Sequence, residues 1–305
     1  MDKEVLLMVG TVMEEPVQFI CNNKRLYGIL HIPDSVVTPA TIMIILTGGP
    51  QVRTGGHRLY VQLSRFLCGH NVSTFRFDYE GSGDSEGDFV GFQHAGPSLA
   101  AAIHFLHNRF KNELNVIIWS LCDGAAAAAL YAATNQEYIR GLVLCNPFVI
   151  TEQGVARSNI KHYYGKRFFD KEFLRNLICF RLNFKRTIKS LLQNIIDAQF
   201  FTMNKTIVTT SNKTFSPALV IDSLQKLKKP IRIILSTDDI VAANFQDELK
   251  KNKAIKNDYK KNKIINSFIK GADHTFVDPS AREKLFSLTL QAVNEIESIG
   301  FANVS

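Results

Sequence analysis

Hydrophobic and polar positions follow two successive patterns along the chain. Between Val17 and Pro33, two runs of alternating character meet at Asn22, Asn23 and Lys24. This pattern predicts an antiparallel β-hairpin. Farther along, apolar strand-like runs alternate with helical stretches. A hairpin followed by repeated βα units predicts an α/β fold, with a mostly parallel sheet between helices and antiparallel strands at one edge.

The repeated units occupy two separate parts of the chain. The predicted strands are TIMIILTGG, VSTFRFDYEG, NVIIWSLCDG, GLVLCNPF, IRIILSTDD and KIINSFIKGADH. The predicted helices are HRLYVQLSRFLCGH, SLAAAIHFLHNRF, AAAAALYAATN, a polar helix around Gln246 to Lys251, and a final amphipathic helix from about Pro279 to Ile299. Residues 149–217 lack the strand pattern and are basic, aromatic and helix-like. We therefore expect a core formed by residues 1–148 and 218–305, interrupted by a helical insertion over 149–217.

The net charge of +8 is concentrated in two segments. Residues 157–189 contain ten Lys and Arg, opposed by Asp170 and Glu172, and a second Lys-rich stretch spans Lys250 to Lys263. Solvated surface is the simpler interpretation of both segments. The alternative is an anion-binding surface near a substrate entrance, which could also make peripheral membrane contact. No helix-turn-helix, zinc-finger or RNA-binding aromatic signature accompanies the charge, so we expect no nucleic acid partner.

Composition predicts a globular cytoplasmic protein without a cofactor or metal. The 305 residues are 46% hydrophobic and 21% charged, and no apolar run approaches the roughly 18 residues that span a bilayer. The N-terminus carries Asp2 and Glu4 and lacks the features of a secretory signal. Five cysteines without a CxxC pair favour free thiols in a reducing compartment. The glycine-rich residues 81–87 do not match a phosphate-binding loop and are expected to rim the site.

The segment NVIIWSLCDGAAAAALYAA places Cys122 at a turn between an apolar strand and an alanine-rich helix. This is the pattern of a nucleophile elbow, with the small residues Ser120 and Gly124 two places on either side. A position at the start of a helix favours the reactive thiolate. We predict that Cys122 is the nucleophile. The alternatives are a buried structural cysteine or a nucleophilic Ser120, which would still lie on the strand.

A thiol nucleophile needs a base and a group that orients the base. The strand IRIILSTDD ends in Asp238 and Asp239, and His274 follows the last predicted strand. We predict that His274 is the base and that Asp239 orients it. A helix N-cap or turn role fits Asp238 better than Asp239. Asp273 is interpreted as a turn residue.

An oxyanion hole needs two backbone N–H donors, one from the residue after the nucleophile and one from the loop after an earlier strand. Asp123 supplies the first. The second is expected from the TGGPQ segment, where Gly49 is preferred because Pro50 has no N–H to donate. A plain glycine turn is the alternative for this segment.

The sequence resembles the exosortase A system-associated hydrolases of the α/β-hydrolase superfamily. The resemblance spans nearly the whole chain, and its carriers are GGPQVRTGGHRLYVQLSRFL, FRFDYEGSGDSEG, WSLCDGAAAAALYAA with GLVLCNPF, ILSTDDIVAANF, and GADHTF. It implies an eight-stranded α/β-hydrolase fold with a helical cap, a Cys122, Asp239 and His274 triad, and a bacterial setting linked to exopolysaccharide production. Ser120 stands where that family usually has glycine, which would crowd the elbow, and Glu80 stands where a basic residue is common.

These residues together favour hydrolysis of an ester or thioester through an acyl-cysteine intermediate. The substrate would be a small or carrier-linked acyl compound, whose anionic groups the basic insertion could bind. An acyltransferase would use the same triad, and a non-catalytic scaffold protein would keep only the fold. The sequence does not distinguish the acyl group, the leaving group or the oligomeric state.

Overall fold

The computed structural model describes residues 12–48, 51–89, 91–110, 114–149, 217–252, 255–261 and 263–301. All elements named below belong to one compact unit, which comprises Met1–Ile150 and Phe215–Ser305. The predicted helical insertion falls almost entirely outside the described residues, so it stays a prediction. Within the described residues, no helix combines the length and apolar character that a membrane crossing requires.

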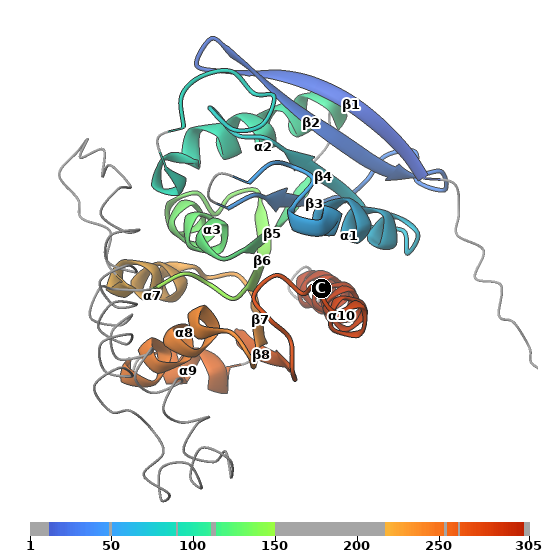
Figure 1. Cartoon of the computed structure of the whole chain (residues 1–305). Helices are drawn as coiled ribbons and strands as arrows, with labels where there is room; N and C mark the ends of the chain where they lie inside the picture. The colour runs from blue at the N-terminus through green and yellow to red at the C-terminus, as the bar shows by residue number, and fades with distance from the viewer. Residues whose placement is uncertain are drawn as a thin grey trace, which may run out of the picture. The chain divides into compact units, whose positions relative to one another are not determined.

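An eight-stranded sheet forms the centre of the unit, as the sequence predicts (Figure 1). The strands are β1 (Val12–Cys21), β2 (Lys24–Pro33), β3 (Thr41–Leu46), β4 (Ser73–Phe77), β5 (Asn115–Leu121), β6 (Ile139–Cys145), β7 (Ile231–Ser236) and β8 (Ile264–Ile269). Their order is β1-β2-β4-β3-β5-β6-β7-β8. The pairs from β4 through β8 are parallel, whereas β1 with β2 and β2 with β4 are antiparallel. This is the predicted α/β arrangement with antiparallel strands at one edge.

The predicted hairpin is present but begins earlier than expected. The turn lies at Asn22 and Asn23, whose φ angles of 48° and 64° suit a two-residue hairpin turn. β1 begins at Val12, five residues before the predicted start. Its pairing with β2 includes Pro16, which lies opposite Ile29. Proline has no N–H to donate to a neighbouring strand, so it is tolerated here because β1 is the edge strand.

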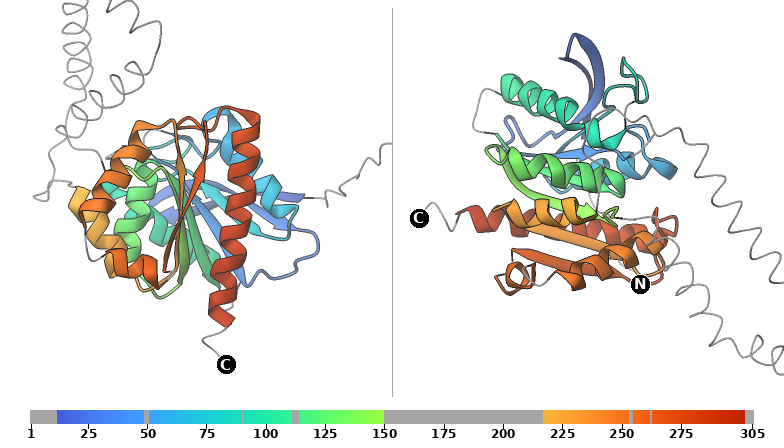
Figure 2. Two further views of the ribbon diagram at one scale, coloured as in Figure 1. Left: turned by 90° about the horizontal axis from the view of Figure 1, so that it is seen from below. Right: turned by 90° about the vertical axis from the view of Figure 1, so that its left-hand side faces the viewer.

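Helices cover both faces of the sheet (Figures 1 and 2). One face carries α1 (Leu59–Cys68) and α10 (Pro279–Phe301), and the other carries α2 (Gly96–Phe110), α3 (Asp123–Thr134), α7 (Pro217–Lys226), α8 (Ile240–Lys251) and α9 (Ile255–Lys260). Two clusters of buried apolar residues lie on the two sides of the sheet. The strands are therefore covered on both faces, which accounts for their continuous apolar runs.

The sequence did not predict two of the helices, α7 and α9. α7 begins at Pro217, where the insertion was expected to end, and buries Val220, Ile221 and Leu224. α9 lies within the Lys-rich stretch and buries Ile255. Both are short, and the surrounding lysines obscure the apolar spacing of α9. The Lys-rich stretch is thus partly a packed helix and not only solvated surface.

Candidate active site

The turn between β5 and α3 has the backbone of a nucleophile elbow. Cys122 occupies φ 60° and ψ −124°, a conformation that residues other than glycine rarely adopt. Its carbonyl accepts hydrogen bonds from Ala125 N at 3.1 Å, in the first turn of α3, and from Phe148 N at 3.0 Å. Its own N–H donates to Cys145 O at 3.0 Å. These bonds hold the strained residue on both sides.

The elbow requires small residues around it. A Cβ added to Gly124 would collide with Ser120 Oγ and lie 2.8 Å from Thr47 O. A Cβ added to Gly48 would collide with the Asp123 carboxylate and lie 2.9 Å from Leu121 O. Both glycines are needed because the chain after β3 approaches the start of α3 this closely.

Ser120 is accommodated at the elbow because the residue beside its hydroxyl, Gly124, has no side chain. Its side chain is fully buried, and Oγ donates a hydrogen bond of 2.6 Å to Leu46 O on the neighbouring strand. The hydroxyl therefore joins β5 to β3. It has no exposure to a substrate, which argues against a nucleophilic Ser120.

His274 and Asp239 come together as predicted. Nδ1 of His274 lies 2.8 Å from Oδ2 of Asp239, whose side chain is 3% exposed. Asp239 also accepts hydrogen bonds from Val241 N at 3.0 Å and Ala242 N at 3.3 Å, at the start of α8. The expectation that an N-cap role fits Asp238 better was wrong, because Asp239 both caps the helix and contacts the imidazole.

The neighbouring backbone aligns these two loops. Asp238 N donates to Ala272 O at 3.1 Å, and Gly271 N donates to Thr237 Oγ1 at 2.8 Å. The carboxylate of Asp273 accepts from Val277 N at 3.0 Å, which confirms its interpretation as a turn residue. The loop that carries His274 is thus tied to the loop that carries Asp239.

The electrostatic environment favours a protonated His274. Burial lowers its pKa, but hydrogen bonds to Asp239 and to the side chain of Cys122, with the charges of both groups, outweigh burial and raise the pKa to about 10. The imidazole therefore interacts with the side chains of both Asp239 and Cys122. The structure brings the three predicted triad residues into one chain of interactions, Asp239 to His274 to Cys122.

The remaining described cysteines lie in different surroundings. Cys21, Cys68 and Cys145 are buried, whereas Cys122 is partly exposed. Burial raises the pKa of all three buried thiols, that of Cys68 to about 11. These three are core residues, as expected. Cys179 lies outside the described residues.

Only part of the predicted oxyanion hole is described. Asp123 is the first residue of α3, directly after Cys122, and its carboxylate accepts from Gly124 N at 3.0 Å. Gly49 and Pro50 lie outside the described residues. Gly48, which precedes them, is close to Leu121 and Asp123. The segment before Gly49 therefore reaches the elbow, and the donation from Gly49 stays a prediction.

The sequence profile of the hydrolase family described as serine aminopeptidase, S33, matches residues 54–286. This range covers most of the chain and includes Cys122, Asp239 and His274. The chain belongs to this S33 hydrolase family. The protein is therefore a hydrolase with the α/β-hydrolase fold.

Solved structures with this fold are similar to the S33 hydrolase over nearly its whole length. An esterase of Pyrococcus furiosus has a TM-score of 0.63 at 16% identity, covering 94% of this chain and 95% of its own. A dienelactone hydrolase of Anabaena variabilis has a TM-score of 0.59 at 15% identity, covering 93% and 98%. A proline iminopeptidase of Mycobacterium smegmatis has a TM-score of 0.58 at 14% identity, covering 94% and 100%. At these identities the likeness concerns the fold. No curated protein matches the sequence significantly.

The S33 hydrolase anchors the loop after Gly49 through residues that the sequence analysis did not single out. Arg53 N donates to Asp78 Oδ1 at 2.5 Å, and its guanidinium contacts Asp78 and Asp84. Gln51 accepts from Tyr60 Oη at 2.8 Å and from Ser82 Oγ at 2.7 Å. Residues 81–87 were predicted only to rim the site, but they brace this loop. Asp78 could have been found from the sequence, because a carboxylate at the end of the apolar run FRFDY is expected to be buried and to need a partner.

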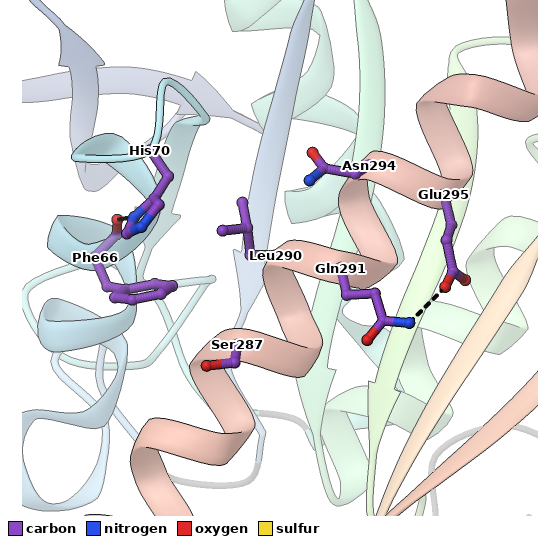
Figure 3. A pocket seen from close by; sticks show the side chains of 7 residues that line it. All are labelled: Phe66, His70, Ser287, Leu290, Gln291, Asn294 and Glu295. Carbon is purple, nitrogen blue, oxygen red and sulfur yellow. Dashed lines mark hydrogen bonds between the residues drawn. The ribbon is translucent and has the colours of Figure 1, made fainter.

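A hollow elsewhere on the S33 hydrolase lacks the chemistry of Cys122, His274 and Asp239. A hollow of about 510 Å³ lies between α1 and α10 (Figure 3) and is lined by Phe66, His70, Ser287, Leu290, Gln291, Asn294 and Glu295. His70 Nδ1 is 2.8 Å from Phe66 O, and Gln291 donates to Glu295 at 2.8 Å. These two polar side chains thus bond locally. Among the described residues, no three His, Cys, Asp or Glu side chains form a cluster that could hold a metal ion.

Proposed function

We propose that this hydrolase cleaves an ester or thioester by covalent catalysis, with Cys122 as the nucleophile, His274 as the acid and base, and Asp239 as the residue that orients His274. The observation that carries the proposal is the position of the His274 imidazole between Asp239, at 2.8 Å, and the side chain of the strained Cys122. A nucleophile, a base and an orienting acid in hydrogen-bond sequence form the constellation of acyl-transfer enzymes.

In the first step, the Cys122 thiolate attacks the carbonyl carbon of the substrate, and the C–S bond forms as the carbonyl oxygen takes up negative charge. His274, protonated and hydrogen-bonded to Asp239, donates its proton to the leaving alcohol or thiol as the bond to that group breaks. The product of this step is an acyl-cysteine. Backbone N–H groups of Gly49 and Asp123 would stabilise the oxyanion.

In the second step, the now neutral His274 removes a proton from water, and the resulting hydroxide attacks the acyl-cysteine carbonyl. The C–S bond breaks and the acid leaves, which restores the thiolate and the imidazolium. Transfer to an alcohol or amine in place of water would make the protein an acyltransferase with the same residues. Membership of a hydrolase family favours water.

The proposed substrate is a small or carrier-linked acyl compound. Thioesters suit a thiolate because the attack is close to thiol exchange, and the basic residues between 157 and 189 could bind the phosphates of a carrier. A link to exopolysaccharide production and a cytoplasmic location rest on the sequence alone. A non-catalytic scaffold is the competing proposal, and the contacts of His274 with Asp239 and Cys122 argue against it.

The test is a panel of acyl esters and acyl-CoA thioesters assayed with the wild type and with Cys122→Ala. We expect turnover by the wild type, a loss of at least about a thousandfold in kcat for Cys122→Ala, and an acyl adduct on the peptide containing Cys122 by mass spectrometry. Turnover retained by Cys122→Ala, or an adduct on another residue, would contradict the assignment.

Ser120→Ala is the matched control at the elbow. Removing its hydroxyl breaks the hydrogen bond to Leu46 O and should cost about 1 kcal/mol of stability. We expect kcat to stay within about threefold of the wild type, because Ser120 is not proposed to touch the substrate. Loss of turnover in folded Ser120→Ala with retention in Cys122→Ala would make Ser120 the nucleophile.

A further inference from the structure

Asn146 follows β6 directly and is one of the few fully buried polar residues near the triad. It is 0% exposed and adopts φ 42°. Asparagine enters this left-handed region more readily than most residues. Its backbone N–H donates to Ile234 O at 3.0 Å, which extends the pairing between β6 and β7 by one step.

The side-chain amide of Asn146 joins two loops of the site. Oδ1 accepts from Ser236 N at 2.8 Å, and Nδ2 donates to Ser236 Oγ at 2.9 Å, at the end of the strand that leads to Asp239. Nδ2 also donates to His274 O at 3.2 Å. One amide group therefore contacts both the strand before the orienting acid and the backbone of the base.

The backbone on either side of Asn146 contacts the nucleophile. Cys145 O accepts from Cys122 N at 3.0 Å, and Phe148 N donates to Cys122 O at 3.0 Å. The segment 145–148 thus holds both peptide groups of the elbow, while the side chain within it holds the His274 loop. Segment 145–148 therefore connects the backbone of Cys122 to the backbone of His274.

We propose that Asn146 is a positioning residue that sets the His274 imidazole against the Cys122 thiol. The inference rests on the proposed function and adds a residue to it. Asparagine fits because one end of its amide accepts and the other donates. Aspartate would keep the acceptor for Ser236 N and lose the donor to His274 O, and an apolar residue would lose both and leave buried groups unpaired.

The test compares Asn146→Gly and Asn146→Asp with Ser236→Ala. Asn146→Gly permits the positive φ and removes every side-chain bond, whereas Asn146→Asp keeps the acceptor, replaces the donor to His274 O with an oxygen, and adds an ionisable acid at a buried position. Ser236→Ala removes the hydroxyl partner of Asn146 and leaves the bond to His274 O intact. Folding of each variant is checked by circular dichroism and thermal melting.

We expect kcat to fall about ten- to a hundredfold in folded Asn146→Gly and Asn146→Asp, with KM within about threefold of the wild type, because the base is misplaced while the substrate surface is unchanged. The alkylation rate of Cys122 by iodoacetamide should fall in parallel, and its pH profile should shift. Ser236→Ala, which removes only the bond between Asn146 Nδ2 and Ser236 Oγ, should keep the wild-type kcat and pH profile.

Wild-type kcat and pH profile in either folded Asn146 variant would overturn the inference. So would failure of both variants to fold while Ser236→Ala folds, because Asn146 would then serve overall stability. Failure of the proposed function looks different: the wild type itself would then show neither turnover nor preferential alkylation of Cys122.

Discussion

His274 lies between two groups that can carry negative charge, and this placement determines its protonation. Asp239 is buried and uses its carboxylate for three contacts, with the imidazole and with the first turn of α8. The N-cap bonds fix the carboxylate, so it holds the imidazole in one orientation. The imidazole also interacts with the side chain of Cys122. The raised pKa favours the imidazolium form of His274.

Acylation should depend on pH through the protonated form of His274. Because the pKa of His274 is raised from 6.5 to about 10, the proton that the leaving group needs is retained up to about pH 10. We expect kcat/KM for an ester with a poor leaving group to decline only near that pH. Asp239→Asn should move the decline to lower pH, since it removes a hydrogen bond and a charge that raise the pKa. An alkaline limb near pH 7 in the wild type would contradict this.

The same shift has a consequence for stability with a defined sign. The folded-state pKa lies above the unfolded value, so the contribution of His274 is fully present below about pH 6.5 and is lost as the pH rises through about 10.

At this scale the sequence indicated Cys122, Asp239 and His274 because each occupies a recognisable place after a strand. It did not indicate Asn146 or Arg53. The bonds of Asn146 join residues up to 128 positions apart, and those of Arg53 reach residues in the loop after β4. Such contacts depend on how strands pair and how loops meet, which a local pattern does not encode.

At the scale of elements, the join between β5 and α3 depends on close backbone approach. Gly124 faces Ser120 Oγ and Thr47 O, so Gly124→Ala should destabilise the fold by about 1–3 kcal/mol. It should also lower kcat by displacing Cys122. Chemical denaturation and steady-state kinetics measure the two effects.

Gly56→Ala is the control for Gly124→Ala. A Cβ at Gly56 meets nothing within 4 Å, and this exposed position has no positive φ. We expect its stability to stay within about 0.5 kcal/mol of the wild type. Equal effects of the two substitutions would show that the elbow is not tightly packed.

The order and type of most elements could be predicted because buried parallel strands form continuous apolar runs and the longer helices show clear spacing. β1 was predicted too short because Pro16 interrupts its pattern, although an edge strand accommodates it. α9 has only six residues in a Lys-rich segment, so its buried Ile255 gives no recognisable period.

At the scale of the whole molecule, a buried basic pair supports the packing of the hairpin against the sheet. Arg76 Nε on β4 donates to His31 Nε2 on β2 at 2.9 Å, and His31 is 0% exposed. The donor is a guanidinium, so His31 must accept and is neutral. Burial, followed by the charge of Arg76, lowers the pKa of His31 to about 4.

This pair predicts acid sensitivity of the fold. The folded-state pKa of His31 lies below its unfolded value of 6.5, so the unfolded chain takes up a proton first and stability falls between about pH 6.5 and 4. The contribution of His31 to the free energy of unfolding should fall by about 2 kcal/mol between pH 7 and pH 5. His31→Gln, which can still accept from Arg76, should lose less stability over this interval in urea denaturation. An identical pH dependence would rule out His31 as the cause.

The most direct test of the central claim is the rate at which iodoacetamide labels each cysteine at pH 7, followed by peptide mapping in a Cys179→Ser background. We expect Cys122 to react faster than the buried Cys21, Cys68 and Cys145, and His274→Ala to abolish the advantage. Uniform labelling of the four cysteines, or a Cys122 rate unaffected by His274→Ala, would contradict a thiolate activated by His274.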